Sequence, residues 1–199
     1  MKNIVRLFIG LIVLSSLSSC GYNGMVQKRE AVNKAWANVE SAYQRRADLI
    51  PNLVNTVKGV ADFEQSTLQK VIEARASATS IKLDANDLTD ENLAKFEAAQ
   101  NQLKGSLSRL LVSCERYPDL QATQSFRDLQ AQLEGTENRI NTERNRFNEA
   151  VNDYNATIQS FPEVITAKWF GFTPKAYFKS NAGAENAPTV DFSKKDDNK

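Results

Sequence analysis

The stretch FRDLQAQLEGTENRINTERNRFNEAVNDYNATIQSF, residues 126–161, decides the fold of this chain. Large apolar residues recur in it at every seventh position: Phe126, Leu133, Ile140, Phe147, Tyr154 and Phe161. This spacing places them on one face of an α-helix. Pro162 follows the last of them directly and is typical of a helix end. The stretch therefore predicts one long amphipathic helix that buries its apolar face against other helices.

A long first helix is predicted from Val26 onward, because apolar residues again step by threes and fours: Val32, Trp36, Val39, Tyr43, Ile50, Leu53, Val57 and Val60. Pro51 lies inside this series. Proline removes one backbone hydrogen bond and clashes with the preceding turn, so we expect a kink rather than an end. The pattern loses its phase around Gly59–Phe63, where we expect a break.

Two shorter helices are predicted between these long ones. The second carries Leu68, Val71, Ile72 and Ala76 and ends in residues 77–80, and the third carries Leu93, Phe96, Leu103, Leu107, Leu110 and Cys114. The polar segment 82–90 between them reads as a loop, with Thr89 or Asp90 as the N-cap. Tyr117 precedes Pro118 and is expected to end the third helix.

Four helices with short connections predict an all-α fold, an antiparallel four-helix bundle over residues 26–178. The segment Val164–Phe178 is rich in aromatic residues and has little helical period. We expect Trp169, Phe170 and Phe172 to cap the core, the alternative being an exposed patch for a partner or a membrane. Residues 179–199 have few apolar side chains and are expected to be a disordered tail.

A short apolar run, Leu7–Leu14, follows Lys2 and Arg6 and leads into Leu17-Ser18-Ser19-Cys20. This is the pattern of a bacterial lipoprotein signal, and the run is shorter than the ~20 apolar residues of a spanning helix. We expect residues 1–19 to be cleaved and Cys20 to carry the lipid, with residues 20–25 as a short tether. The protein would then lie in the bacterial envelope on the extracytoplasmic side of a membrane.

Composition excludes several classes of function. The chain has no histidine, and the formal net charge of +1 becomes about −1 once Lys2 and Arg6 are removed. Histidine-containing metal sites and Ser-His-Asp triads are therefore excluded, and a basic field for nucleic acid is missing. Cys114 is the one cysteine left beside a lipidated Cys20, so no internal disulfide is expected. No phosphate-binding glycine motif occurs, and we expect neither a cofactor nor a small-molecule substrate.

Several ordered motifs resemble the LemA family. They include Arg45-Arg46-Ala47-Asp48-Leu49-Ile50-Pro51-Asn52-Leu53-Val54, Glu115-Arg116-Tyr117-Pro118-Asp119-Leu120 and Thr136-Glu137-Asn138-Arg139-Ile140. The resemblance runs from Tyr22 to about Phe178. It implies a four-helix bundle held at a bacterial membrane, with no established enzymatic activity, and a LemA-like member that takes part in building magnetosome membranes suggests scaffolding. Many members keep an N-terminal transmembrane helix, whereas this sequence ends its apolar segment at Cys20.

Polar residues interrupt the apolar seams at similar heights in the first and last helices. The predicted polar core layer consists of Arg45, Arg46, Asp48, Glu137, Asn138 and Arg144. One interpretation is an ion-paired layer that fixes the register of the helices. The alternative is a carboxylate site for a metal or for acid–base chemistry, with Glu137, Asp48 and Glu143 as candidates. We favour the structural interpretation, and hence an envelope scaffold with a protein partner and no catalytic residues, because arginines match the carboxylates and would compete with a cation.

Overall fold

The computed structural model describes residues 2–60 and 63–179, with side chains from residue 21 onward. In these ranges the ordered elements are all helices: α1 (Lys2–Lys58), α2 (Gln65–Ser80), α3 (Asp90–Cys114), α4 (Pro118–Ala122), α5 (Gln124–Gln159) and α6 (Glu163–Phe170). The prediction of an all-α fold is confirmed. The predicted last helix corresponds to α5, which α4 and α6 flank as two short helices that were not predicted.

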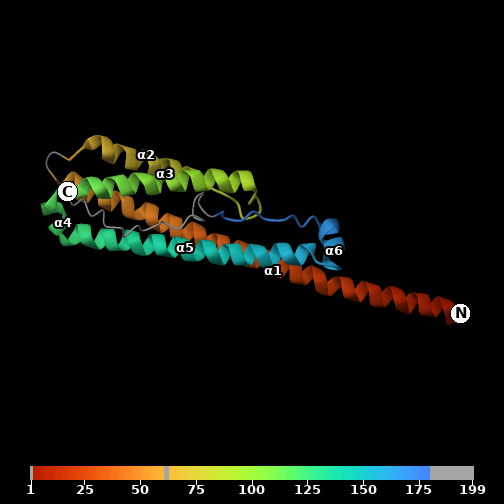
Figure 1. The fold of residues 1–199 in the computed structure, drawn as a ribbon. Coiled ribbons are helices and arrows are strands. Elements are labelled where there is room, and N and C mark those ends of the chain that lie inside the picture. The colour runs from red at the N-terminus through yellow and green to blue at the C-terminus, as the bar shows by residue number, and fades with distance from the viewer. Residues whose placement is uncertain (1, 61–62, 180–199) are drawn as a thin grey trace, which may run out of the picture.

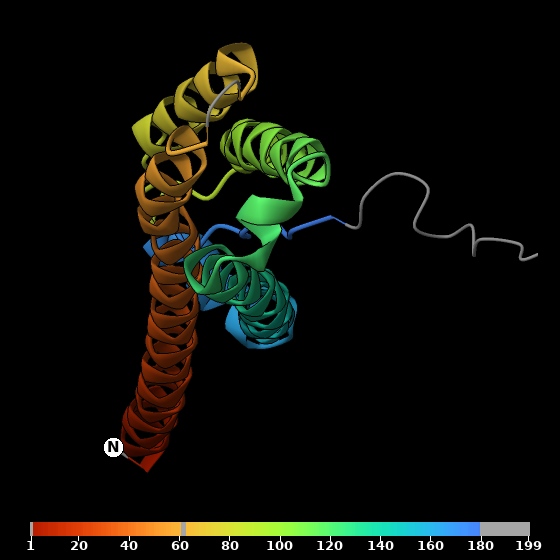
Figure 2. The same ribbon diagram turned by 90° about the vertical axis from the view of Figure 1, so that its left-hand side faces the viewer.

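The four long helices pack as two antiparallel pairs that lie side by side (Figures 1 and 2). α1 packs mainly on α5, and α2 packs mainly on α3. The direction of the first pair follows from two ion pairs, since Lys28 meets Asp153 and Arg46 meets Glu137. In the same way Lys104 of α3 meets Glu137 of α5, while Glu97 meets Arg144, so these two helices are antiparallel as well.

The core consists of two hydrophobic clusters along the length of the body. One cluster joins α1, α5 and the chain around residues 88–96 to the C-terminal segment, with Trp36, Phe147 and Tyr154 at its centre. The other joins all four long helices, with Leu53, Val71, Leu110 and Phe126 among its members. In α1 the first cluster ends at Tyr43 and the second begins at Ile50, so Arg46 lies between them.

α1 is longer than the sequence predicted. It begins at Lys2 rather than Val26, so the expected tether 20–25 is helical, and it continues through Pro51 to Lys58. The N-terminal part of α1 projects beyond the rest of the body past α6 (Figure 1). The side chains of the predicted signal, residues 1–19, and of Cys20 lie outside the described part. Among the residues that the structure does describe, no helix is both long and apolar enough to cross a membrane.

The connection between α2 and α3 follows the predicted loop. Thr89 caps α3 by accepting a hydrogen bond from the backbone N–H of Asn92, as expected. The C-terminal segment also holds this loop, because the Lys175 ammonium donates to the carbonyls of Ala85 and Asn86 at 2.8 and 2.9 Å. Burial lowers the pKa of the Lys175 ammonium from its usual range.

The end of the last seam differs from the prediction. Phe161 continues the seven-residue spacing, yet α5 ends at Gln159 and the Phe161 side chain is 81% exposed. Pro162 disfavours helical geometry in the residue before it, and the chain turns there into α6. Gly171 ends α6 in the left-handed conformation, φ 71°, which a residue without Cβ adopts without strain.

The segment after α6 runs back along α5 and closes one end of the core. Phe172 and Phe178 are buried, as expected of a cap, whereas Trp169 and Phe170 are 85% and 61% exposed. The cap prediction is therefore wrong for these two side chains, because α6 turns Ala167 toward the core instead. Residues 180–199, which make up nearly all of the predicted disordered tail, lie outside the described residues.

Candidate functional site

The strongest candidate site is a polar layer between the two hydrophobic clusters. Its centre is Arg46 of α1, whose side chain is only 4% exposed. The Arg46 guanidinium donates to Glu137 Oε2 of α5 at 3.1 Å and to Gln100 Oε1 of α3 at 2.7 Å. It also donates to the Gln100 carbonyl at 3.2 Å and lies over the Tyr43 ring, 5.1 Å from its centroid. One buried cation thus ties α1 to both α3 and α5.

Glu137 accepts from two basic side chains. Besides Arg46, the Lys104 ammonium lies 2.5 Å from Glu137 Oε1, and the glutamate side chain is 28% exposed. Burial lowers the pKa of the Arg46 guanidinium, while the neighbouring Glu137 charge opposes that shift. Arginine stays protonated in proteins, so this layer is a charge pair completed by an amide.

Gln100 and Lys104 were missed in the sequence. Gln100 nevertheless occupies the seam of α3, between Phe96 and Leu103 at the alternating spacing of three and four. A buried glutamine in an apolar series needs partners for its amide, and the side-chain N–H donates to the Ala78 carbonyl of α2 at 3.2 Å. This position was the signal that α3 also contributes to the layer.

The other predicted members of the layer lie elsewhere. Arg45, Asp48 and Asn138 are exposed on the outer faces of α1 and α5, and Asp48 accepts from Gln44 on its own helix. Arg144 does not reach Glu137. It pairs with Glu97 of α3 at 2.6 Å and covers the Phe178 ring at 4.5 Å, which makes a second, half-buried ion pair nearer the C-terminal segment. Burial raises the pKa of the Glu97 carboxyl, and Arg144 opposes this.

Glu143 is the most buried carboxylate in the described residues. Its side chain is 1% exposed, and Oε1 accepts from Arg139 at 2.8 Å and from Arg146 at 2.9 Å on the same helix. The seam positions of α5 are thus Thr136 and Glu143, each one residue before the predicted Glu137 and Arg144. Leu129, Thr136 and Glu143 follow one another at intervals of seven residues, so the seam that starts at Leu129 continues through Thr136 and Glu143 instead of Glu137 and Arg144.

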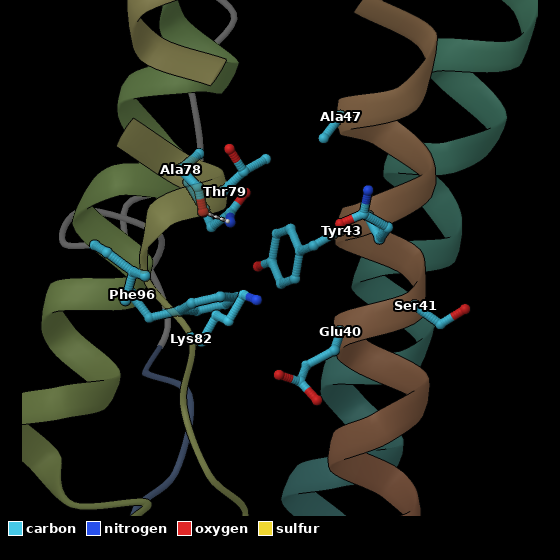
Figure 3. A pocket seen from close by; sticks show the side chains of 11 residues that line it. Glu40, Ser41, Tyr43, Ala47, Ala78, Thr79, Lys82 and Phe96 are labelled. Atoms are coloured by element: carbon cyan, nitrogen blue, oxygen red, sulfur yellow. Dashed lines mark hydrogen bonds between the residues drawn. The ribbon is translucent and has the colours of Figure 1, made fainter. Parts of the chain in front are cut away.

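An open pocket of about 340 Å³ adjoins the polar layer between α1, α2 and α3 (Figure 3). Tyr43 projects into it from α1, with Glu40 on the same helix and Lys82 on the opposite side. Burial raises the pKa values of both the Tyr43 hydroxyl and the Glu40 carboxyl. Gln100 lines the pocket as well, so the pocket borders the buried layer described above.

The layer links three helices through Arg46. Within the described residues, no group of three or more histidine, cysteine, aspartate and glutamate side chains is arranged to hold a metal ion. Cys114, the one cysteine with a described side chain, is buried, and burial raises the pKa of its thiol to about 11. The geometry defines a helical protein whose buried carboxylates are neutralised by arginine and lysine.

Comparisons with known proteins identify the family of this chain. The sequence model of the LemA family matches residues 35–192. The chain is 26% identical over 196 residues to magnetosome protein MamQ of Magnetospirillum gryphiswaldense, covering 87% of this chain and 72% of that protein. It is 20% identical over 139 residues to protein LemA of Metamycoplasma hominis, covering 70% and 60% of the two chains. This chain belongs to the LemA family, as its motifs predicted.

Proposed function

We propose that this chain is a lipid-anchored scaffold or interaction protein of the bacterial cell envelope, which works through contact rather than catalysis. Its body would be a LemA-type antiparallel four-helix bundle on the extracytoplasmic side of a membrane. The likeness to a protein named for the magnetosome, a bacterial structure rather than a reaction, supports a structural role.

The observation that carries the proposal is the pairing of the buried carboxylates. Glu137 and Glu143 each accept from two basic side chains. Cations placed this close to a carboxylate repel a metal ion, so neither group is arranged as a metal ligand. A layer that joins three helices instead fixes their register.

The N-terminal segment supports attachment to a membrane. Its sequence combines a basic start, an apolar run and a cysteine after small residues, and two acyl chains on Cys20 would anchor the protein durably. The backbone of residues 2–20 projects from the body as the start of α1 (Figure 1), so an anchor there lies clear of the core.

Elemental analysis tests the non-catalytic part of the proposal against a carboxylate metal site. The full chain, purified without chelators, should carry no divalent metal in stoichiometric amount, and Glu137→Gln should leave the metal content unchanged. The matched control is Glu134→Gln, an exposed carboxylate one turn earlier on α5. The contradicting result is one metal ion per chain that is lost in Glu137→Gln but kept in Glu134→Gln, with both variants folded. It would refute the scaffold proposal in favour of a metal-binding protein.

A further inference from the structure

Exposed apolar side chains concentrate at one place on this protein. Four of the large hydrophobic side chains that the described residues expose fall within ten residues: Phe161 (81%), Ile165 (54%), Trp169 (85%) and Phe170 (61%). We call these four residues the α6 patch. Of the remaining ones Tyr22 adjoins the patch through Phe170, whereas Ile72, Val112 and Tyr177 lie singly on other elements, as exposed hydrophobic residues usually do. An apolar patch with an exposed tryptophan indicates a surface that a membrane or another molecule covers.

The geometry of α6 explains why the patch faces outward. Ile165 and Trp169 are four residues apart and share one face of the helix. Ala167 lies midway between them in sequence, so it points about 200° around the helix from each, and it is the buried residue of α6. The helix thus packs on the body through Ala167, with Phe170 beside it against Tyr22, and turns Ile165 and Trp169 away from the body.

The place of α6 in the fold indicates what covers the patch. α6 lies against α1 at the first two residues whose side chains are described, because a Cβ at Gly21 would stand 3.6 Å from Glu163 Cγ. The Tyr22 ring lies 4.8 Å from the Phe170 ring. Cys20 comes directly before Gly21, and the N-terminal part of α1 leaves the body at this level (Figure 1). Whatever surface receives the N-terminal segment must therefore lie beside the α6 patch.

The chemistry of the patch fits a lipid surface. Tryptophan and other aromatic side chains concentrate at the boundary between headgroups and acyl chains, where an apolar ring meets a polar layer. Lys168, exposed and next to Trp169, can extend its ammonium toward lipid phosphates while its stem stays among apolar groups.

We propose that the α6 patch inserts into the headgroup region of the membrane that holds the N-terminal anchor. α6 is then a second contact with the bilayer, which fixes the tilt of the body instead of letting it swing on residue 20. The inference rests on the membrane attachment proposed above. It does not depend on cleavage of residues 1–19, since a retained apolar N-terminal helix enters the bilayer from the same place.

The two tryptophans of the chain provide the test, because Trp36 is 1% exposed in the core and Trp169 is 85% exposed in the patch. The full-length protein is reconstituted in vesicles of phosphatidylethanolamine and phosphatidylglycerol, with or without bromine on the acyl chains. Brominated lipid should quench the tryptophan emission of the wild type. Trp169→Phe, which keeps only the buried Trp36, should lose that quenching.

A matched pair of variants separates local insertion from general loss of binding. Ile165→Glu should weaken the quenching of Trp169 by brominated lipid, whereas Val112→Glu should not, since Val112 is a similarly exposed aliphatic residue on α3. Vesicle flotation is measured on every sample. The protein could float with the vesicles while Trp169 is not quenched by bromolipid and is quenched by aqueous acrylamide. This result would overturn insertion of the α6 patch and leave membrane attachment standing.

Two other outcomes also count against the inference. Trp169 that stays unquenched by bromolipid in the vesicles, and becomes shielded from acrylamide only when envelope proteins are added to them, would assign the patch to a protein partner instead of lipid. A full-length chain that does not float at all contradicts membrane attachment itself, and the inference falls with it.

Discussion

Removing one partner of the ion pair between Arg46 and Glu137 should destabilise the fold far more than breaking a surface pair that joins the same two helices. Lys28 and Asp153 also connect α1 to α5, at the same 3.1 Å, but their side chains are 45% and 61% exposed. Arg46 and Glu137 are 4% and 28% exposed. The two pairs differ mainly in burial, and burial decides how strongly water competes with the attraction.

The magnitudes follow from what each substitution leaves behind. Removing one partner of a buried pair costs about 3–5 kcal/mol. Arg46→Ala leaves Glu137 with Lys104 and some water, so we expect a loss near 3 kcal/mol, at the lower end of that range. Glu137→Ala leaves a buried guanidinium with only the oxygens of Gln100, so we expect about 4–5 kcal/mol.

Urea denaturation of the four single and two double alanine variants, with the full chain in mild detergent, measures both couplings. The Arg46/Glu137 cycle should give a coupling free energy of about 1–3 kcal/mol. The Lys28/Asp153 cycle should give about 0.2–1 kcal/mol. Additive losses for Arg46 and Glu137, or a larger coupling for the exposed pair, would refute the argument that the layer locks the helices together.

Three further predictions follow from other parts of the chain. The Cys20→Ser variant should leave the membrane fraction or remain unprocessed, because the acyl anchor is gone. Cell fractionation measures this, and a variant that is fully processed and still tightly bound to the membrane would refute lipidation. Cys114 should react with a thiol reagent only on unfolding. The free energy of unfolding should fall as pH rises from about 9 to 11, since the thiolate forms freely only in the unfolded chain. The Asn155 side chain both donates to and accepts from the Lys175 backbone at 2.9 Å. Asn155→Ala should therefore speed amide hydrogen exchange in residues 172–178 without unfolding α5. Unchanged exchange in those residues would show that Asn155 does not hold the C-terminal segment.

The helices could be predicted from the sequence where apolar periodicity is strong. In α5 the five side chains from Phe126 to Tyr154 are buried as the seven-residue spacing requires, and Pro51 does not end α1. α4 has only five residues, too few to show a period, and α6 buries a single alanine. Elements this short depend on tertiary packing, which a pattern along one chain does not contain.

The polar layer could be predicted only in part, for a related reason. Arg46 and Glu137 do come together, since both stand at the same height of antiparallel helices. Gln100 and Lys104 come from a third helix whose register against α5 the sequence left open. Arg144 pairs with Glu97 for the same reason, and Glu143 takes the buried position because it lies two seven-residue steps after Leu129, in the same seam.

Site-specific photo-crosslinking in native membranes tests the central claim, action by contact, most directly. A benzophenone side chain replaces exposed residues on the polar face of α5, such as Arg127 and Asn141, with buried Phe147 as the control position. We predict adducts of discrete mass at one or more exposed positions and none at Phe147. A correctly localised protein that forms no adduct at any exposed position along α2, α3 and α5 would contradict the scaffold account.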